Sequence, residues 1–223
     1  MRKVDIPEVM RILRRECGRL ETPYVTEVSE RRGQDQDQDP FRVLVSCILS
    51  LRTKDQVTRE ASERLFRLAD TPAALAALRR GVIERAIYPA GFYRVKAATL
   101  KEVSREIWKK YSSRVPDTIE ELLKLKGIGR KTANLVVTMG FGKPGICVDT
   151  HVHRITNRWG FVRTSSPVET EFELRKKLPK RYWIPLNDLL VTWGQNICRP
   201  VSPLCSRCAL NRYCGRVGVK KRR

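Results

Sequence analysis

The sequence of 223 residues contains no apolar run that approaches the ~20 residues needed for a membrane-spanning helix. The charged residues after Met1 are not followed by the apolar segment of a secretory signal. We therefore expect a cytoplasmic, nucleoid-associated protein with no membrane partner. Apolar residues still make up 41% of the chain, which excludes a wholly disordered protein and allows a hydrophobic core.

Acidic residues are also scarce. The chain has 24 Asp and Glu against 45 Lys and Arg, a formal net charge of +21. Such an excess opposes compactness through self-repulsion, so it usually serves a polyanionic partner. The basic residues are spread along the chain, and only residues 220–223 form a terminal run. This pattern is typical of a folded face that lies along phosphates, with a solvated basic surface as the alternative.

Patterns of β-strands and of internal repeats are missing, and helical patterns dominate. Apolar residues recur at helical spacing in residues 57–68 and 97–111. Thr71-Pro72 and Thr118 with Glu121 are typical of helix N-termini. These features predict an all-α fold.

Two breaks interrupt the helical pattern. Residues 33–40 read Gly-Gln-Asp-Gln-Asp-Gln-Asp-Pro and predict an exposed loop. Residues 140–145 are rich in glycine and proline, which indicates a junction between two domains.

The segment from Lys126 to Arg130 predicts a phosphate-binding turn. A capped helix ends at Gly127-Ile128-Gly129, and the next helix begins at once. Glycines allow a sharp turn, and the amides at the positive end of a helix dipole suit a phosphate oxygen. An ordinary helical corner is the alternative. The basic flanks and the net charge favour DNA, bound without reading its sequence.

Lys131 and Asp149 are the candidate catalytic residues. Lys131 falls in the first turn of a helix, where the helix dipole disfavours a cation. It can serve as a nucleophile or as a second phosphate contact, and the local sequence does not decide between them. Asp149 follows the Gly/Pro-rich break, so it can cap the next helix or point a carboxylate into a cleft between domains.

The chain has seven cysteines, and this odd number argues against a disulfide framework. Four of them follow the spacing Cys-X6-Cys-X2-Cys-X5-Cys near the C-terminus. Structural zinc sites usually pair cysteines in two separate knuckles, and this segment contains only one. The spacing therefore favours a [4Fe-4S] cluster over a single zinc ion or unliganded thiols. The candidate ligands are Cys198, Cys205, Cys208 and Cys214.

The stretches LKGIGRKTAN and VDTHVHR and the cysteine spacing together resemble the endonuclease III family. These are bifunctional DNA glycosylases of the helix-hairpin-helix, Gly/Pro-rich loop, Asp superfamily. The resemblance, from about residue 39 to residue 214, implies two helical domains that flank a DNA-binding cleft. Residues 33–143 would form a six-helix barrel with the hairpin. Residues 1–32 and 144–223 would form a discontinuous domain with the cluster.

The resemblance also implies the reaction. Lys131 and Asp149 match the family's catalytic lysine and aspartate, so both base release and strand cleavage by β-elimination are expected. The expected enzyme is a monomer that acts on oxidised or ring-saturated pyrimidines in double-stranded DNA.

Further DNA contacts are expected in two parts of the chain. Phe92 matches an apolar wedge that enters the base stack. Contacts are also expected from His151 and from three arginines of the cysteine-rich segment, Arg199, Arg207 and Arg212.

Arg52 departs from the family pattern, which often has glutamine at this position. Arginine can pair with a guanine edge, so a thymine or uracil glycosylase specific for G·T and G·U mismatches is an alternative. The alternative outside the enzymes is a non-catalytic DNA-binding module with a structural zinc.

Overall fold

The computed structural model describes residues 4–19 and 40–223. Every regular element in these residues is helical, which confirms the expected all-α fold. No helix among them is long and apolar enough to cross a membrane. The expected loop at residues 33–40 lies outside the described residues, except for Pro40.

Two compact units make up the chain. Unit 1 comprises Met1–Pro23 and Pro144–Arg223, and unit 2 comprises Tyr24–Lys143. Because residues 20–39 lie outside the described part, the assignment of residues 33–143 to one domain, and of residues 1–32 and 144–223 to the other, stays a prediction.

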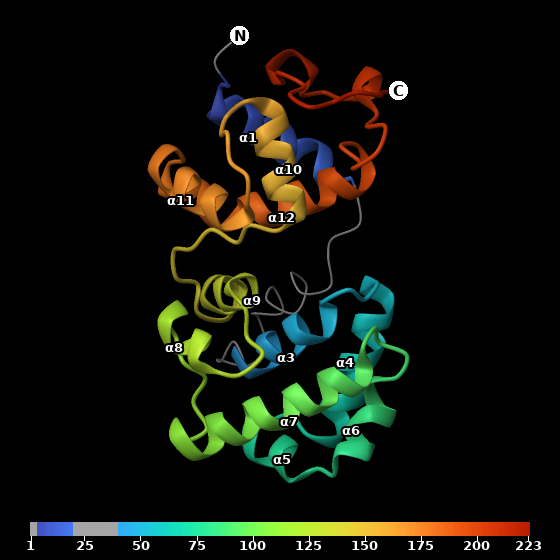
Figure 1. Cartoon of the computed structure of the whole chain (residues 1–223), viewed down its shortest axis with the longest axis vertical. Helices are drawn as coiled ribbons and strands as arrows, with labels where there is room; N and C mark the ends of the chain where they lie inside the picture. The colour runs from blue at the N-terminus through green and yellow to red at the C-terminus, as the bar shows by residue number, and fades with distance from the viewer. Residues whose placement is uncertain (1–3, 20–39) are drawn as a thin grey trace. The chain divides into compact units, whose positions relative to one another are not determined.

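The core of unit 2 is built from α-helices, and the last of them continues into a π-helical turn. Its longest helix, α7, packs against α3, α5 and α6 (Figure 1). The elements are α3 (Pro40–Ser50), α4 (Asp55–Leu68), α5 (Pro72–Ala77), α6 (Arg80–Ile87), α7 (Tyr93–Lys110), α8 (Ile119–Lys124), α9 (Arg130–Leu135) and η1 (Val136–Gly140). Leu44, Ile48, Leu65 and Leu100 are almost completely buried among these helices.

The helix ends of unit 2 follow from local chemistry. Thr71 accepts a hydrogen bond from the amide of Ala74 at the start of α5, and Thr118 caps α8 in the same way, as the sequence predicts. Basic side chains donate hydrogen bonds to the C-terminal ends of three helices, where backbone carbonyl groups lack partners within the helix. Lys101 donates to carbonyls at the end of α5, Arg64 to carbonyls at the end of α6, and Lys96 to a carbonyl of α3.

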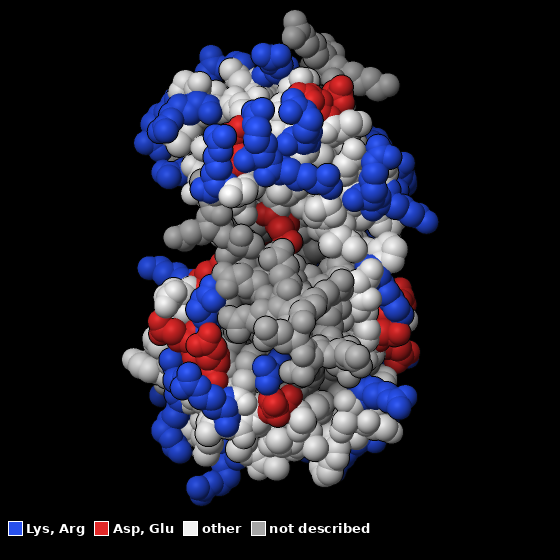
Figure 2. Space-filling view, turned by 180° about the vertical axis from the view of Figure 1, so that it is seen from behind, with Lys and Arg blue, Asp and Glu red and all other residues white. Residues whose placement is uncertain are grey.

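Unit 1 has a separate core around α12, which packs against α1 and α10. Its elements are α1 (Ile6–Cys17), α10 (Thr150–Trp159), α11 (Pro167–Lys177), η2 (Lys180–Tyr182), α12 (Trp183–Asn196), η3 (Cys205–Arg207) and η4 (Asn211–Tyr213). Lys and Arg side chains cover much of the face of this unit shown in Figure 2, with few acidic side chains among them.

Candidate active site and metal centre

The turn between α8 and α9 depends on Gly127. This residue has a φ of +90°, and a Cβ atom there would lie 2.8 Å from Cγ2 of Thr99. Both the backbone and the close approach therefore require glycine. Gly129 has an ordinary φ of −91°, and, its two chain neighbours aside, no described residue has an atom within 4 Å of the place where its Cβ would be. Folding does not require a glycine at 129, but a ligand could approach the backbone closely there.

Ile128 differs from the expectation that grouped it with the DNA contacts of this turn. Its side chain is only 6% exposed and packs in the core of unit 2. Its amide donates to the carbonyl of Leu125 at 3.1 Å. Ile128 therefore anchors the turn from inside, while Lys126, Gly127 and Gly129 are exposed.

Lys131 lies half-buried in the first turn of α9. Gly129 provides no side-chain cap, and the first turn contains Arg130 and Lys131 but no acidic residue. Two cations at the positive end of a helix dipole oppose local stability and favour an anionic partner. This arrangement agrees both with Lys131 as a nucleophile and with Lys131 as a second phosphate contact.

Asp149, in unit 1, is the N-cap of α10. Its Oδ1 accepts hydrogen bonds from the amides of His151 at 2.8 Å and Val152 at 2.9 Å. The capping role considered for Asp149 is therefore confirmed, and it fixes the direction of the carboxylate. The side chain of His151 lies beside Arg154, with 3.1 Å between Nδ1 and Nη2.

Arg52 and Phe92 lie together in unit 2, although 40 positions separate them in the sequence. Arg52 follows α3 and Phe92 precedes α7. The guanidinium of Arg52 lies 5.6 Å from the centre of the Phe92 ring. Phe92 is 62% exposed, as a side chain that enters a base stack must be.

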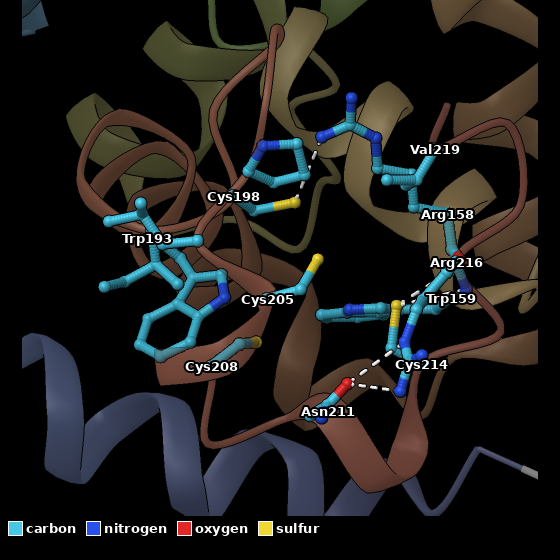
Figure 3. Close-up of a pocket in the computed structure, with 13 residues that line it drawn as sticks. Arg158, Trp159, Trp193, Cys198, Cys205, Cys208, Asn211, Cys214, Arg216 and Val219 are labelled. Carbon is cyan, nitrogen blue, oxygen red and sulfur yellow. Dashed lines mark hydrogen bonds between the residues drawn. The ribbon is translucent and has the colours of Figure 1, made fainter. Parts of the chain in front are cut away.

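All four C-terminal cysteines line one pocket in unit 1 (Figure 3). Cys198 follows α12, Cys205 begins η3, Cys208 follows η3, and Cys214 follows η4. All four are free of disulfides. The side chains of Trp159 and Trp193 also line the pocket.

The cysteines surround a space and do not meet at a point. Among the described residues, no three Cys, His, Asp or Glu side chains converge as ligands of a single metal ion. Burial raises the pKa of the Cys208 thiol to about 12 and also raises the pKa of Cys214. Without a cation, these thiols therefore resist ionisation.

Comparison with known proteins identifies the family. Residues 45–180 match the family described as "HhH-GPD superfamily base excision DNA repair protein". Endonuclease III of Thermotoga maritima is 50% identical over 178 residues, which cover 80% of this chain and 84% of that protein. The chain belongs to the endonuclease III family.

More distant relatives agree with this assignment. The chloroplastic endonuclease III homolog 1 of Arabidopsis thaliana is 42% identical over 183 residues, which cover 78% of this chain and 48% of the plant protein. This chain thus spans about half the length of the plant protein. The structure of a trapped endonuclease III–DNA covalent intermediate matches with a TM-score of 0.74 at 34% identity, over 85% of this chain and 92% of that chain. As a member of this family, the protein is a base excision repair DNA glycosylase and lyase, as its motifs predict.

Two arginines of α10 hold the backbone around the first cysteine of the pocket, a role that their sequence motif does not predict. Arg158 Nη1 lies 3.4 Å from Cys198 Sγ and donates to the carbonyl of Arg199 at 2.7 Å. Arg154 Nη2 donates to the carbonyl of Cys198 at 2.8 Å. Their spacing of four residues places both on one face of the helix, which was the available signal. This helix thus connects Asp149 at its N-terminus with the first cysteine of the pocket.

Residues after Cys214 also shape the cysteine-rich segment. Arg216 donates its amide to Cys214 Sγ at 3.4 Å and its guanidinium to Asn211 Oδ1 at 2.6 Å. Val219 lines the pocket. The predicted contacts Arg199, Arg207 and Arg212 are exposed on this segment.

Proposed function

We propose that this protein removes oxidised or ring-saturated pyrimidines from double-stranded DNA and cuts the strand at the resulting abasic site. The observation that carries the proposal is Lys131, a lysine in the first turn of the helix that follows the glycine turn, in a chain of the endonuclease III family. A lysine amine supplies the nucleophile for a covalent intermediate. The likeness to a trapped covalent endonuclease III–DNA intermediate supports such a step.

DNA binding would begin at the glycine turn. Backbone groups near Gly129 hold a phosphate, with Lys126 and Arg130 adding charge. The net charge of +21 and the likeness to endonuclease III–DNA complexes support DNA as the partner. Because these contacts address the backbone, they bind DNA of any sequence. Arg52 and Phe92 then occupy the stack while the damaged nucleotide is extruded, which costs least for a poorly stacked base.

The chemistry would follow from two side chains. The neutral amine of Lys131 attacks C1′ of the sugar, the bond from C1′ to the base breaks, and the base leaves with its bonding electrons. The carboxylate of Asp149 stabilises the positive charge that develops on the sugar. Ring opening gives a Schiff base on Lys131. Loss of a C2′ proton breaks the C3′–O bond and cuts the strand, and hydrolysis restores the amine.

Four cysteines would hold a [4Fe-4S] cluster in the pocket of unit 1. Each thiolate of such a cluster binds a different iron, so ligands that surround a space fit it better than they fit one zinc ion. The all-sulfur donor set suits iron, and the bound cluster would keep the buried thiols ionised. When bound, the cluster would fold the loop that carries Arg199, Arg207 and Arg212 and take no part in bond breaking.

Borohydride trapping on a duplex with one thymine glycol tests the proposal. A covalent adduct between DNA and the wild-type protein should form, and Lys131→Ala should abolish it. Lys124→Ala is the matched control, because it removes an exposed lysine of α8 that the proposal gives no DNA contact, and it leaves the nucleophile. Base release without trapping or strand cleavage would contradict the lyase assignment.

Arg52 supports a second candidate, a glycosylase for G·T and G·U mismatches. Its guanidinium lies over the exposed Phe92 ring and offers donors that match O6 and N7 of guanine. Base release from G·T, G·U and thymine-glycol duplexes, measured side by side, separates the two candidates. A colourless protein that holds zinc and releases no base would instead support a non-catalytic module.

A further inference from the structure

Two loops of unit 2 hold the residues assigned to base extrusion. The first wedge loop, residues 51–54, carries Arg52, and the second wedge loop, residues 88–92, carries Phe92. Both residues have left-handed backbone angles, with φ of 52° and 57°. This conformation costs about 1–2 kcal/mol for a residue with a side chain, and it persists only where the surroundings fix it.

The hydroxyl of Thr53 joins the two loops. It accepts hydrogen bonds from Lys96 Nζ at 2.6 Å and from the amide of Gly91 at 3.1 Å. It lies 3.3 Å from the carbonyl of Leu51, to which it donates. One donor and two acceptor positions exhaust the capacity of a hydroxyl group. Its contacts therefore tie the first wedge loop, the second wedge loop and α7 together at one atom.

Lys96 contributes this link from a buried position. It lies in the first turn of α7, is 6% exposed, and also donates to the carbonyl of Leu49 at 2.6 Å. In sequence it occupies the apolar face of α7 with Leu100, Val103 and Ile107, where burying a charge is costly. A methionine would fill this place without that cost, so the lysine serves a purpose other than packing.

Gly91 shows how closely the loops approach. A Cβ atom there would lie 2.5 Å from the backbone oxygen of Arg52. Its φ is not in the left-handed region, so the contact between the loops is the reason for glycine. A side chain at this position would push the loops apart.

We infer that Lys96 and Thr53 are positioning residues that latch the two wedge loops, so that Arg52 and Phe92 enter DNA as one preformed pair. This inference rests on the proposed function. Without the latch, each loop must be ordered while the base leaves the stack, and that ordering slows extrusion. The bond-breaking residues Lys131 and Asp149 are not touched by the latch.

Lys96→Met and Thr53→Val test the latch, because each removes its hydrogen bonds with little change in volume. Lys101→Met is the matched control. Lys101 also lies on α7 and also donates two hydrogen bonds, to the carbonyls of Ala76 and Leu78, but it holds neither wedge loop. The readouts are single-turnover base release from a thymine-glycol duplex and the fluorescence of 2-aminopurine opposite the lesion, which rises on extrusion. Thermal melting of every variant reports folding.

Both latch variants should slow base release and the fluorescence rise by about 10-fold or more. In Lys101→Met both rates should stay within about two-fold of the wild-type rates, even if its melting temperature falls as far as that of the latch variants. Wild-type rates in Thr53→Val, or an equal loss in Lys101→Met, would overturn the latch. If Lys96→Met fails to fold, Thr53→Val decides alone. A wild-type protein that releases no base would instead overturn the proposed function.

Discussion

Asp149 combines a structural and a proposed catalytic role, and two substitutions separate them. Asp149→Ala removes the acceptor of both amide hydrogen bonds at the start of α10. Loss of such a cap costs about 1–2 kcal/mol, which for a chain of this size lowers the melting temperature by about 2–8 °C. Asp149→Asn keeps an oxygen acceptor in place and should lose less than about 1 kcal/mol, chiefly its interaction with the helix dipole.

The rate of base release should fall in both Asp149→Ala and Asp149→Asn, although the two variants differ in stability. Both substitutions remove the negative charge proposed to stabilise the sugar cation, so both should slow base release by about 100-fold or more. The assay is single-turnover base release from a thymine-glycol duplex, with melting temperature and DNA affinity measured on the same samples. A nearly wild-type rate in Asp149→Asn would refute the catalytic role and leave only the cap.

Three further predictions address the turn, the cysteine pocket and the buried lysine. Gly127→Ala should lower the melting temperature by at least about 2–4 °C, because φ is left-handed and Thr99 is close. Gly129→Ala should leave the melting temperature unchanged and weaken DNA binding in a titration. Arg158→Met should speed the loss of visible cluster absorption on heating, because it removes the bonds to Cys198 Sγ and the nearby carbonyls. Burial lowers the pKa of Lys96 to about 8 from 10.5. Between these values only the unfolded state holds the proton, so the wild-type unfolding free energy should rise with pH relative to Lys96→Met.

Distinct results would contradict each of these predictions. Equal melting temperatures and equal DNA affinities for the two glycine variants would show that neither the strain nor the open space matters. If Arg158→Met loses the cluster at the wild-type rate, the bonds from Arg158 do not stabilise the cysteine-rich loop around the cluster. A parallel pH dependence of wild type and Lys96→Met above pH of about 8 would show that the lysine keeps its ordinary pKa.

The features that sequence predicts well are local. The starts of α5 and α8 follow from threonine caps within three residues of the amides they hold. The turn at Gly127 follows from a backbone conformation that few residues other than glycine adopt. The four pocket cysteines lie within seventeen positions, so their spacing alone brings them to one pocket.

Features that depend on distant residues were missed. Lys96 meets Leu49 and Thr53 across 47 and 43 positions, and Arg158 reaches Cys198 across 40. No local pattern encodes such a contact; a lysine on an apolar helix face was the only signal. The flanking glycines place Ile128 among the expected DNA contacts, yet its side chain packs in the core of unit 2. Tertiary packing decided its direction.

The central claim is that Lys131 forms the covalent bond to DNA. The most direct measurement is mass spectrometry of the borohydride-reduced complex after digestion, which locates the modified residue. We predict one adduct, on the peptide that contains Lys131, and none in Lys131→Ala. An adduct on another lysine, or on the N-terminal amine, with Lys131 unmodified would contradict this account of the active site.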